Sequence, residues 1–180
     1  SVSAFEGEDL EAAGIDSLEG VARMTPGFTF QASGQSGLQP PVMRGLTANI
    51  MGLSSSVALV VDGVPTVRGQ GFDDNLLGLE RVEVLRGPQS TLYGRNAEAG
   101  VVSIVTRQPG NDPYAVVSAE IGSREKRVLR FDASHALVQD TLFVGVAGEF
   151  FAQDGFIDNA FKGHKEDGRE RRNGRLALRW

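Results

Sequence analysis

The sequence predicts an α+β unit, in which short helices accompany a short mixed sheet, followed by a series of antiparallel strands. Three observations predict this fold class. Glycine occurs 23 times in 180 residues, which favours turns and close backbone approaches over long helices. Short apolar runs mix with helical patterns in the first half, whereas apolar and polar residues alternate regularly in the second half. Gly and Pro gather between the halves, at residues 109–113, and mark a boundary there.

The first half is expected to hold short helices and short strands. In chain order we expect a strand at residues 2–5, helices at 8–13 and 18–24, and strands at 28–30, 57–61, 80–85 and 101–105. Asp16 or Ser17 can cap the second helix, which Pro26 and Gly27 end. The third expected strand has the unbroken apolar run of a buried strand, ended by an Asp-Gly turn. These elements together predict a compact α+β unit.

The second half predicts four strands of roughly ten residues each. Their apolar positions are 115, 117, 119 and 121, then 129, 131 and 133, then 142, 144, 146 and 150, and finally 176, 178 and 180. The first two connections are short, and the third is a long solvated loop of mixed charge. The same alternation is typical of a soluble antiparallel sheet with one face on a core and of a transmembrane barrel with a polar lumen. On this half alone the soluble sheet is favoured.

Composition argues against several functional classes. The net charge of −5, from 18 basic and 23 acidic side chains, is a poor basis for binding nucleic acid. The absence of Cys excludes disulfide scaffolds, thiolate metal sites and Cys nucleophiles. His135 and His164 are the only histidines and have no ligand-like partner at helical spacing. We therefore expect no cofactor, no metal site and no enzyme. The longest apolar run, at residues 57–61, is far shorter than the ~20 residues of a membrane-spanning helix.

Three segments carry a resemblance to a known family. They are residues 42–46, with an Arg-Gly pair, residues 57–65, ending in Asp-Gly-Val-Pro, and residues 79–106, with Leu-Arg-Gly-Pro and Leu-Tyr-Gly. In this order and spacing they resemble the plug domain of TonB-dependent outer-membrane receptors. The third segment is similar to that of ferric-siderophore receptors of the pesticin-receptor type. Two positions depart from the family pattern, since Ala99 stands where Gly is usual and Arg107 where Lys is common.

The resemblance implies a plug domain at residues 1–109 and, at residues 110–180, the first strands of an incomplete transmembrane β-barrel. Four strands cannot close a barrel of about 22 strands, so we expect the chain to be a piece of a longer receptor. The implied location is the outer membrane, with the plug inside the barrel and facing the periplasm.

The implied function is to bind a scarce extracellular ligand, with a ferric siderophore the leading candidate, and to import it with energy transduced by TonB. The implied partners are TonB, through an upstream segment absent here, the ligand and outer-membrane lipid. Cobalamin, haem and oligosaccharide are the alternative ligands. A plug-like soluble periplasmic binding module is the alternative function.

The resemblance also implies two sets of site residues. Arg44 and Arg86 take the role of plug arginines that pair with barrel-wall carboxylates beyond this chain, and Glu83 is a further charge of this latch. A local ion pair within the plug, such as Arg86 with Glu83, is the alternative. Ligand contacts in the family come from apical plug loops, which correspond here to residues 46–56 and 68–75. The candidate ligand-binding residues are Arg68, Gln70, Phe72 and Asp73, with ordinary solvated loop residues as the alternative for each.

Overall fold

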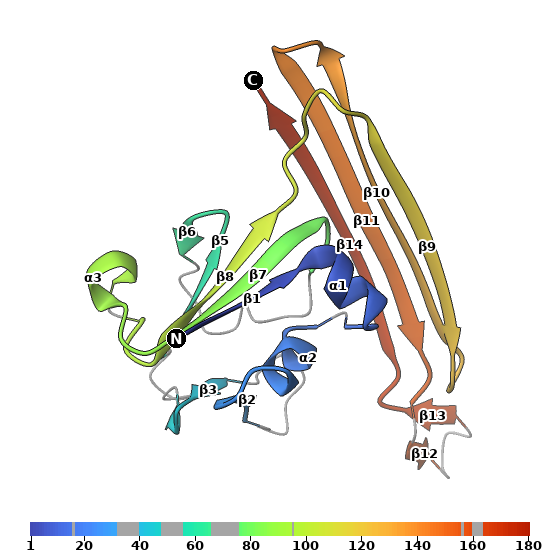
Figure 1. Cartoon of the computed structure of the whole chain (residues 1–180). Coiled ribbons are helices and arrows are strands. Elements are labelled where there is room, and N and C mark those ends of the chain that lie inside the picture. The colour runs from blue at the N-terminus through green and yellow to red at the C-terminus, as the bar shows by residue number, and fades with distance from the viewer. Residues whose placement is uncertain are drawn as a thin grey trace. The chain divides into compact units, whose positions relative to one another are not determined.

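The computed structural model describes residues 1–15, 17–31, 40–47, 56–65, 76–94, 96–155, 157–159 and 164–180. The chain divides into two compact units, Ser1–Arg107 and Gln108–Trp180. Figure 1 shows that the first unit contains short strands and helices, whereas the second contains four long strands.

The main sheet of the first unit has five strands, in the order β1-β7-β8-β5-β6. The strands are β1 (Val2–Glu6), β5 (Val57–Val61), β6 (Val64–Pro65), β7 (Leu79–Arg86) and β8 (Gly100–Thr106). β5 runs parallel to β8, and the other neighbouring pairs are antiparallel. The predicted short mixed sheet is therefore confirmed.

Short helices and a smaller sheet complete the first unit. They are α1 (Gly7–Ala12), α2 (Leu18–Arg23), α3 (Ser90–Tyr93), β2 (Phe28–Phe30), β3 (Pro41–Met43) and β4 (Leu46–Thr47). Ser17 caps α2, because its Oγ accepts a hydrogen bond from the Gly20 N–H at 3.3 Å. The other candidate cap, Asp16, lies outside the described residues. No helix in the described ranges is long and apolar enough to cross a membrane.

The core of the first unit joins these helices to the sheets. Leu10 of α1, Leu18 and Val21 of α2, Phe28 of β2 and Met43 of β3 are fully buried. They belong to one cluster with the inward-facing side chains of β5, β7 and β8. Because α2 and β2 share this cluster, the turn between them is held at a fixed place in the unit.

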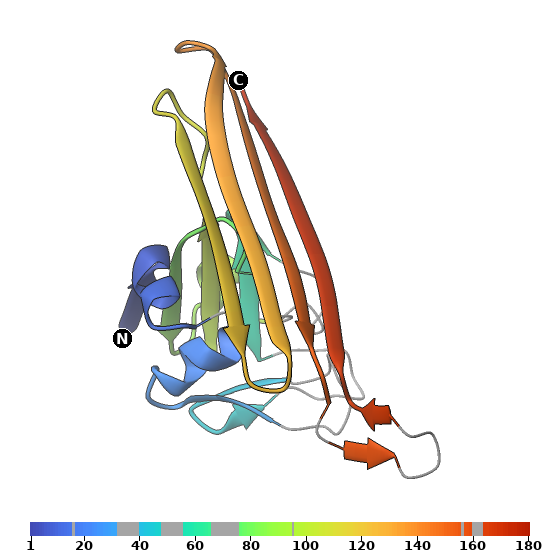
Figure 2. The same cartoon turned by 90° about the vertical axis from the view of Figure 1, so that its right-hand side faces the viewer.

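The second unit is a four-stranded antiparallel sheet, in the order β14-β11-β10-β9. Its strands are β9 (Tyr114–Gly122), β10 (Lys126–Val138), β11 (Leu142–Gln153) and β14 (Arg169–Arg179). Figure 2 shows them lying side by side. The long connection between β11 and β14 holds a small hairpin, β12 (Ile157–Asn159) and β13 (His164–Glu166). The four long strands fall where the alternation predicts them.

The register of this sheet separates two faces. We call the first the apolar face; it includes Val117, Ile121, Leu129, Phe131, Val146, Phe150, Leu176 and Leu178. The charged face carries the intervening positions, among them Lys126, Arg130, Glu149, Arg171, Arg175 and Arg179. Ile121 is 88% exposed and Leu176 68% exposed. The apolar face therefore does not have the burial expected of a soluble sheet packed on a core.

Candidate functional site: two Arg-Gly segments and the charged face

The two Arg-Gly segments meet at the turn that follows α2. The backbone N–H of Arg44 donates a hydrogen bond to the carbonyl of Gly27 at 2.9 Å. The Nη1 of Arg86 donates to the neighbouring carbonyl of Pro26 at 3.0 Å, and its Nη2 lies 3.4 Å from the Ser3 Oγ. Segments more than forty residues apart in sequence are thus positioned by one turn.

The glycine at position 87 lies beside the arginine of the other segment. Arg44 itself adopts a left-handed backbone with φ 54°, and Gly87 has φ 113°. A Cβ at position 87 would make ordinary contact with the Arg44 guanidinium, 3.4 Å from its Nη1. The glycine of the second Arg-Gly pair is therefore required by its own backbone conformation, and it lies next to the Arg44 guanidinium.

A backbone carbonyl and a hydroxyl oxygen are the partners of the Arg86 guanidinium. Among the described residues, no carboxylate lies within 4.0 Å of the guanidinium of Arg44 or Arg86. In the same part of the chain, the Nε of Arg86 is buried and has no hydrogen-bond partner. Two guanidinium groups without a described counter-ion form an arrangement that can accept carboxylates from elsewhere in a larger protein.

Glu83 pairs with Arg81 rather than with Arg86. Its Oε1 accepts a hydrogen bond from the Arg81 Nε at 2.7 Å, and Arg81 also contacts Glu80 at 2.5 Å. The hydrogen bond to Glu83 raises the pKa of the Arg81 guanidinium above its ordinary value. Residues 83 and 86 are three positions apart in β7, so their side chains leave opposite faces of the strand. The local ion pair on this strand therefore involves a different arginine from the one considered as the alternative to the latch.

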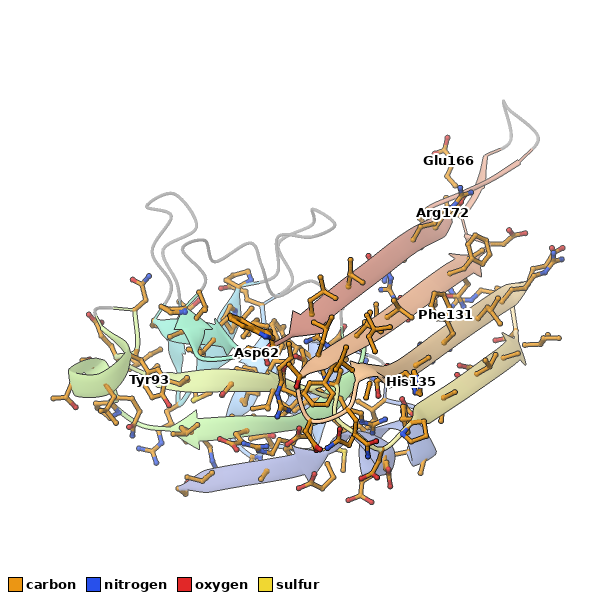
Figure 3. All side chains as sticks on the ribbon, turned by 90° about the horizontal axis from the view of Figure 1, so that it is seen from above. Asp62, Tyr93, Phe131, His135, Glu166 and Arg172 are labelled. Atoms are coloured by element: carbon orange, nitrogen blue, oxygen red, sulfur yellow. The ribbon has the colours of Figure 1, made fainter. Side chains whose placement is uncertain are left out.

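The Asp-Gly turn does more than reverse the chain between β5 and β6. Asp62 and Gly63 have φ values of 50° and 81°, as a tight hairpin turn requires. Figure 3 shows Asp62 beside the strands of the first unit. Its carboxylate accepts hydrogen bonds from the Thr106 N–H at 2.8 Å and the Thr106 Oγ at 2.6 Å. This side chain fastens the hairpin to the end of β8, a contact that the sequence analysis did not predict.

A buried carboxylate joins three strands on the charged face of the second unit. Glu149 of β11 lies 2.8 Å from the Arg130 Nε of β10 and 3.6 Å from the Arg171 Nη2 of β14. The Asn173 Nδ2 donates to the Glu149 Oε1 at 3.4 Å, the oxygen that Arg171 also approaches. Sequence reasoning missed this cluster, because only the register shows that positions 130, 149 and 173 are opposite one another.

The candidate ligand-binding residues Arg68, Gln70, Phe72 and Asp73 all lie outside the described residues. Their role stays a prediction. Of the first expected apical loop, residues 46–56, the two ends are described. The Ser56 Oγ donates a hydrogen bond to the Leu46 carbonyl at 3.3 Å, which holds these ends together.

Comparison with known proteins identifies the family. The model of the TonB-dependent Receptor Plug Domain matches residues 1–101. This chain belongs to the TonB-dependent receptor plug family. The pesticin receptor of Yersinia pestis is 33% identical over 137 residues, which cover 76% of this chain and 20% of the receptor. The vitamin B12 transporter BtuB of Vibrio vulnificus is 30% identical over 87% of this chain and 25% of the transporter.

Solved structures of TonB-dependent receptors show the same fold. The ferric yersiniabactin uptake receptor FyuA from Yersinia pestis matches 99% of this chain, and 28% of its own, with a TM-score of 0.89 and 28% identity. The ferric-catecholate import receptor Fiu from E. coli K12, in its open form, matches 99% of this chain and 24% of its own, with a TM-score of 0.77 and 24% identity. The first unit is thus a plug domain, and the second has the fold of the first barrel strands. The chain spans about a fifth of the length of the pesticin receptors that it matches.

Proposed function

We propose that this chain is the plug and the first barrel strands of an outer-membrane receptor that binds a ferric siderophore and imports it with energy transduced by TonB. The observation that carries the proposal is the similarity to the ferric yersiniabactin uptake receptor over 99% of the chain. The plug would lie inside the barrel and face the periplasm. Such a receptor releases its ligand unchanged, so no catalytic residue is assigned.

In the proposed receptor the plug domain comprises residues 1–109 and the barrel strands comprise residues 110–180. The division of the chain into compact units after Arg107 supports a boundary in this region, as does the start of β9 at Tyr114. Outer-membrane lipid would contact the apolar face, and the charged face would line the lumen.

Arg44 and Arg86 would form the latch that holds the plug to carboxylates of the barrel wall beyond this chain. Support comes from their shared position at the turn after α2 and from the lack of a described counter-ion. Glu83 stays in the predicted latch, where it would act by fixing Arg81, to which it is already bonded. Ligand binding and TonB would rearrange the plug by breaking such ion pairs, a local order–disorder event.

Ligand would be bound by Arg68, Gln70, Phe72 and Asp73. These residues offer a cation, an amide, an aromatic face and an anion, a combination of groups suited to a ferric chelate. Cobalamin is the second candidate ligand, because the vitamin B12 transporter BtuB of Vibrio vulnificus is 30% identical over 87% of this chain.

The proposal is tested with the full-length receptor in its native membrane. Its abundance in purified outer membranes is measured with and without iron depletion, together with the uptake of radioactive iron siderophores and of labelled cobalamin. Strong induction and TonB-dependent iron uptake would support the ferric-siderophore receptor. Cobalamin uptake without iron uptake would support the second candidate. Absence of the protein from outer membranes would contradict both.

A further inference from the structure

One strand of the second unit carries arginines along a single face. Arg169, Arg171, Arg175 and Arg179 of β14 lie opposite Gln153, Phe151, Ala147 and Phe143 of β11. All belong to the charged face, since paired residues of neighbouring strands point to the same side of a sheet. At about 3.4 Å per residue, the arginines extend over about 34 Å, similar to the ~30 Å hydrocarbon thickness of a bilayer. We call this row the arginine ladder.

Aromatic side chains of the neighbouring strand hold two members of the ladder. The Arg171 guanidinium carbon lies 4.5 Å from the centroid of the Phe151 ring, and that of Arg179 lies 5.1 Å from the Phe143 centroid. Arg179 also donates from Nη1 to the Pro109 carbonyl at 3.2 Å. A guanidinium has five N–H donors in one plane. The Phe143 ring lies over the guanidinium of Arg179 and one carbonyl accepts from it, so other N–H donors of Arg179 can still bind an anion.

The charged face has a surplus of positive charge. Its six cationic side chains are Lys126, Arg130, Arg169, Arg171, Arg175 and Arg179, and its three acidic ones are Glu120, Asp132 and Glu149. Local ion pairs account for part of this charge, since Lys126 lies 2.7 Å from Glu120 and Glu149 lies between two arginines. The surplus of three remains whatever further pairs form within the face.

We propose that the charged face of the second unit is an anion-binding surface, along which anionic ferric chelates pass through the receptor. This inference rests on the proposed function and names the charge class of its ligand. Fixed cations on the wall of a pore raise the local concentration of anions and select for them. Arg171, Arg175 and Arg179 are spaced by about 14 Å, so an anion halfway between two of them is about 7 Å from each, within the ~8 Å Debye length of physiological salt. A chelate midway between two arginines of the ladder is therefore attracted by both.

The test measures the ion selectivity of the full-length receptor in planar lipid bilayers, after urea has opened the plug. Potassium chloride is the probe, and the reversal potential in a salt gradient gives the ratio of chloride to potassium permeability. We expect R175Q/R179Q to lower this ratio about twofold or more relative to the wild type, because two fixed charges leave the lumen wall. R175K/R179K keeps the charge and is expected to keep the ratio.

Arg127 and Arg172 provide the matched control. They lie on the opposite side of the same sheet, in register with Ala152 and Phe150, and both are exposed. R127Q/R172Q removes two charges from that side and is expected to leave the ratio unchanged. An unchanged ratio in R175Q/R179Q, or an equal fall in R127Q/R172Q, would overturn the proposal.

A second variant tests the inference independently, in case R175Q/R179Q fails to assemble in the membrane. Ala177 lies on the charged face between two rungs, and A177E adds a negative charge without removing an arginine. We expect it to lower the ratio too, and an unchanged ratio in a properly assembled A177E would also contradict the inference.

Iron uptake separates the proposed function from the proposed anion-binding surface. If the receptor imports iron but these variants do not change its selectivity, the proposed function stands and the anion-binding surface is contradicted. If the variants change the selectivity but the receptor imports no iron, the anion-binding surface stands and the proposed function is contradicted.

Discussion

At the scale of single residues, Ala99 and Gly100 have opposite requirements for a side chain. The family usually has Gly at both positions, and this chain has it only at the second. The Ala99 methyl group is buried in the core of the plug domain. A Cβ at Gly100 would lie 2.2 Å from the Met43 Sδ and 2.4 Å from the Leu85 carbonyl oxygen. The close approach of β7 to β8 therefore requires the second glycine, whereas the first position accommodates a methyl group.

The first prediction compares substitutions at these neighbouring positions. G100A should lower the free energy of unfolding of the plug by about 3 kcal/mol or more, the upper end of the cost of overpacking, because the new methyl group meets backbone that cannot yield. A99G should cost only about 1–2 kcal/mol, from one lost buried methyl and a freer unfolded chain. Urea unfolding monitored by hydrogen exchange of β7 and β8 measures both. A G100A plug as stable as A99G would contradict the close approach.

The second prediction concerns the Asp62 contact with Thr106. D62N keeps a side chain that tolerates the left-handed turn but removes the negative charge and replaces one of the two accepting oxygens with an amide nitrogen. It should cost about 1.5–3 kcal/mol of plug stability, the range for hydrogen bonds to a charged group. T106V removes only the hydroxyl and should cost less, since the N–H bond to Asp62 remains. Equal stability of D62N and the wild type would show that the contact contributes nothing.

These contacts show which features of single residues can be predicted from the sequence and which cannot. The Asp-Gly turn was predictable from its own two residues, because their backbone preferences are local. Its bond to Thr106 was not, since the two residues are 44 positions apart. The meeting of Arg44 and Arg86 at the Pro26 turn is likewise set by tertiary packing. The candidate ligand residues are supported only by the resemblance to the family.

At the scale of elements, period-2 alternation predicted the long strands and their faces well. Alternation over nine or more residues depends only on which side of a strand meets water. β3 and β4 were not expected as strands, because the three residues of β3 are all apolar and do not alternate, and the two residues of β4 are too few to show a period. The alternation also could not decide between a soluble sheet and a barrel, since both keep apolar side chains on one face. The motifs of the plug domain decided it.

The third prediction uses two adjacent valines of β9 that lie on opposite faces. Val117 is on the apolar face and 72% exposed, whereas Val116 is opposite Asp132 on the charged face and 40% exposed. V117R in the full-length receptor should cost about 2–4 kcal/mol, the penalty for Arg near the bilayer midplane. V116R should be tolerated, because its cation would lie beside Asp132. The amount of folded receptor in outer membranes measures both.

Equal amounts of V117R and V116R would contradict contact of the apolar face with lipid. A fall in V116R alone would mean that the faces are assigned the wrong way round. Because the two substitutions introduce the same side chain one residue apart, differences in expression or strand propensity do not distinguish them.

At the scale of the whole molecule, the fourth prediction addresses the latch. R44Q/R86Q should loosen the plug in the full-length receptor, because each lost pair with a partly buried carboxylate is expected to cost about 1–3 kcal/mol. Cells carrying the variant should become several-fold more sensitive to a large antibiotic that the outer membrane normally excludes. R23Q is the control, since Arg23 is exposed and pairs with Glu19 of its own helix. Equal sensitivity of the two variants would contradict the latch.

The order of strands in the plug sheet has a consequence for the route by which the domain folds. Val2 pairs with Leu85, and the parallel partner of β5 is β8, so the strands made first are completed by those made last. Such non-local pairing gives a high contact order and slow folding. After export, β1 must wait as an unpaired edge while some eighty further residues arrive, and unpaired edges are where chains associate wrongly. We therefore expect newly exported plug to depend on periplasmic chaperones for its first seconds, well before any ligand is bound.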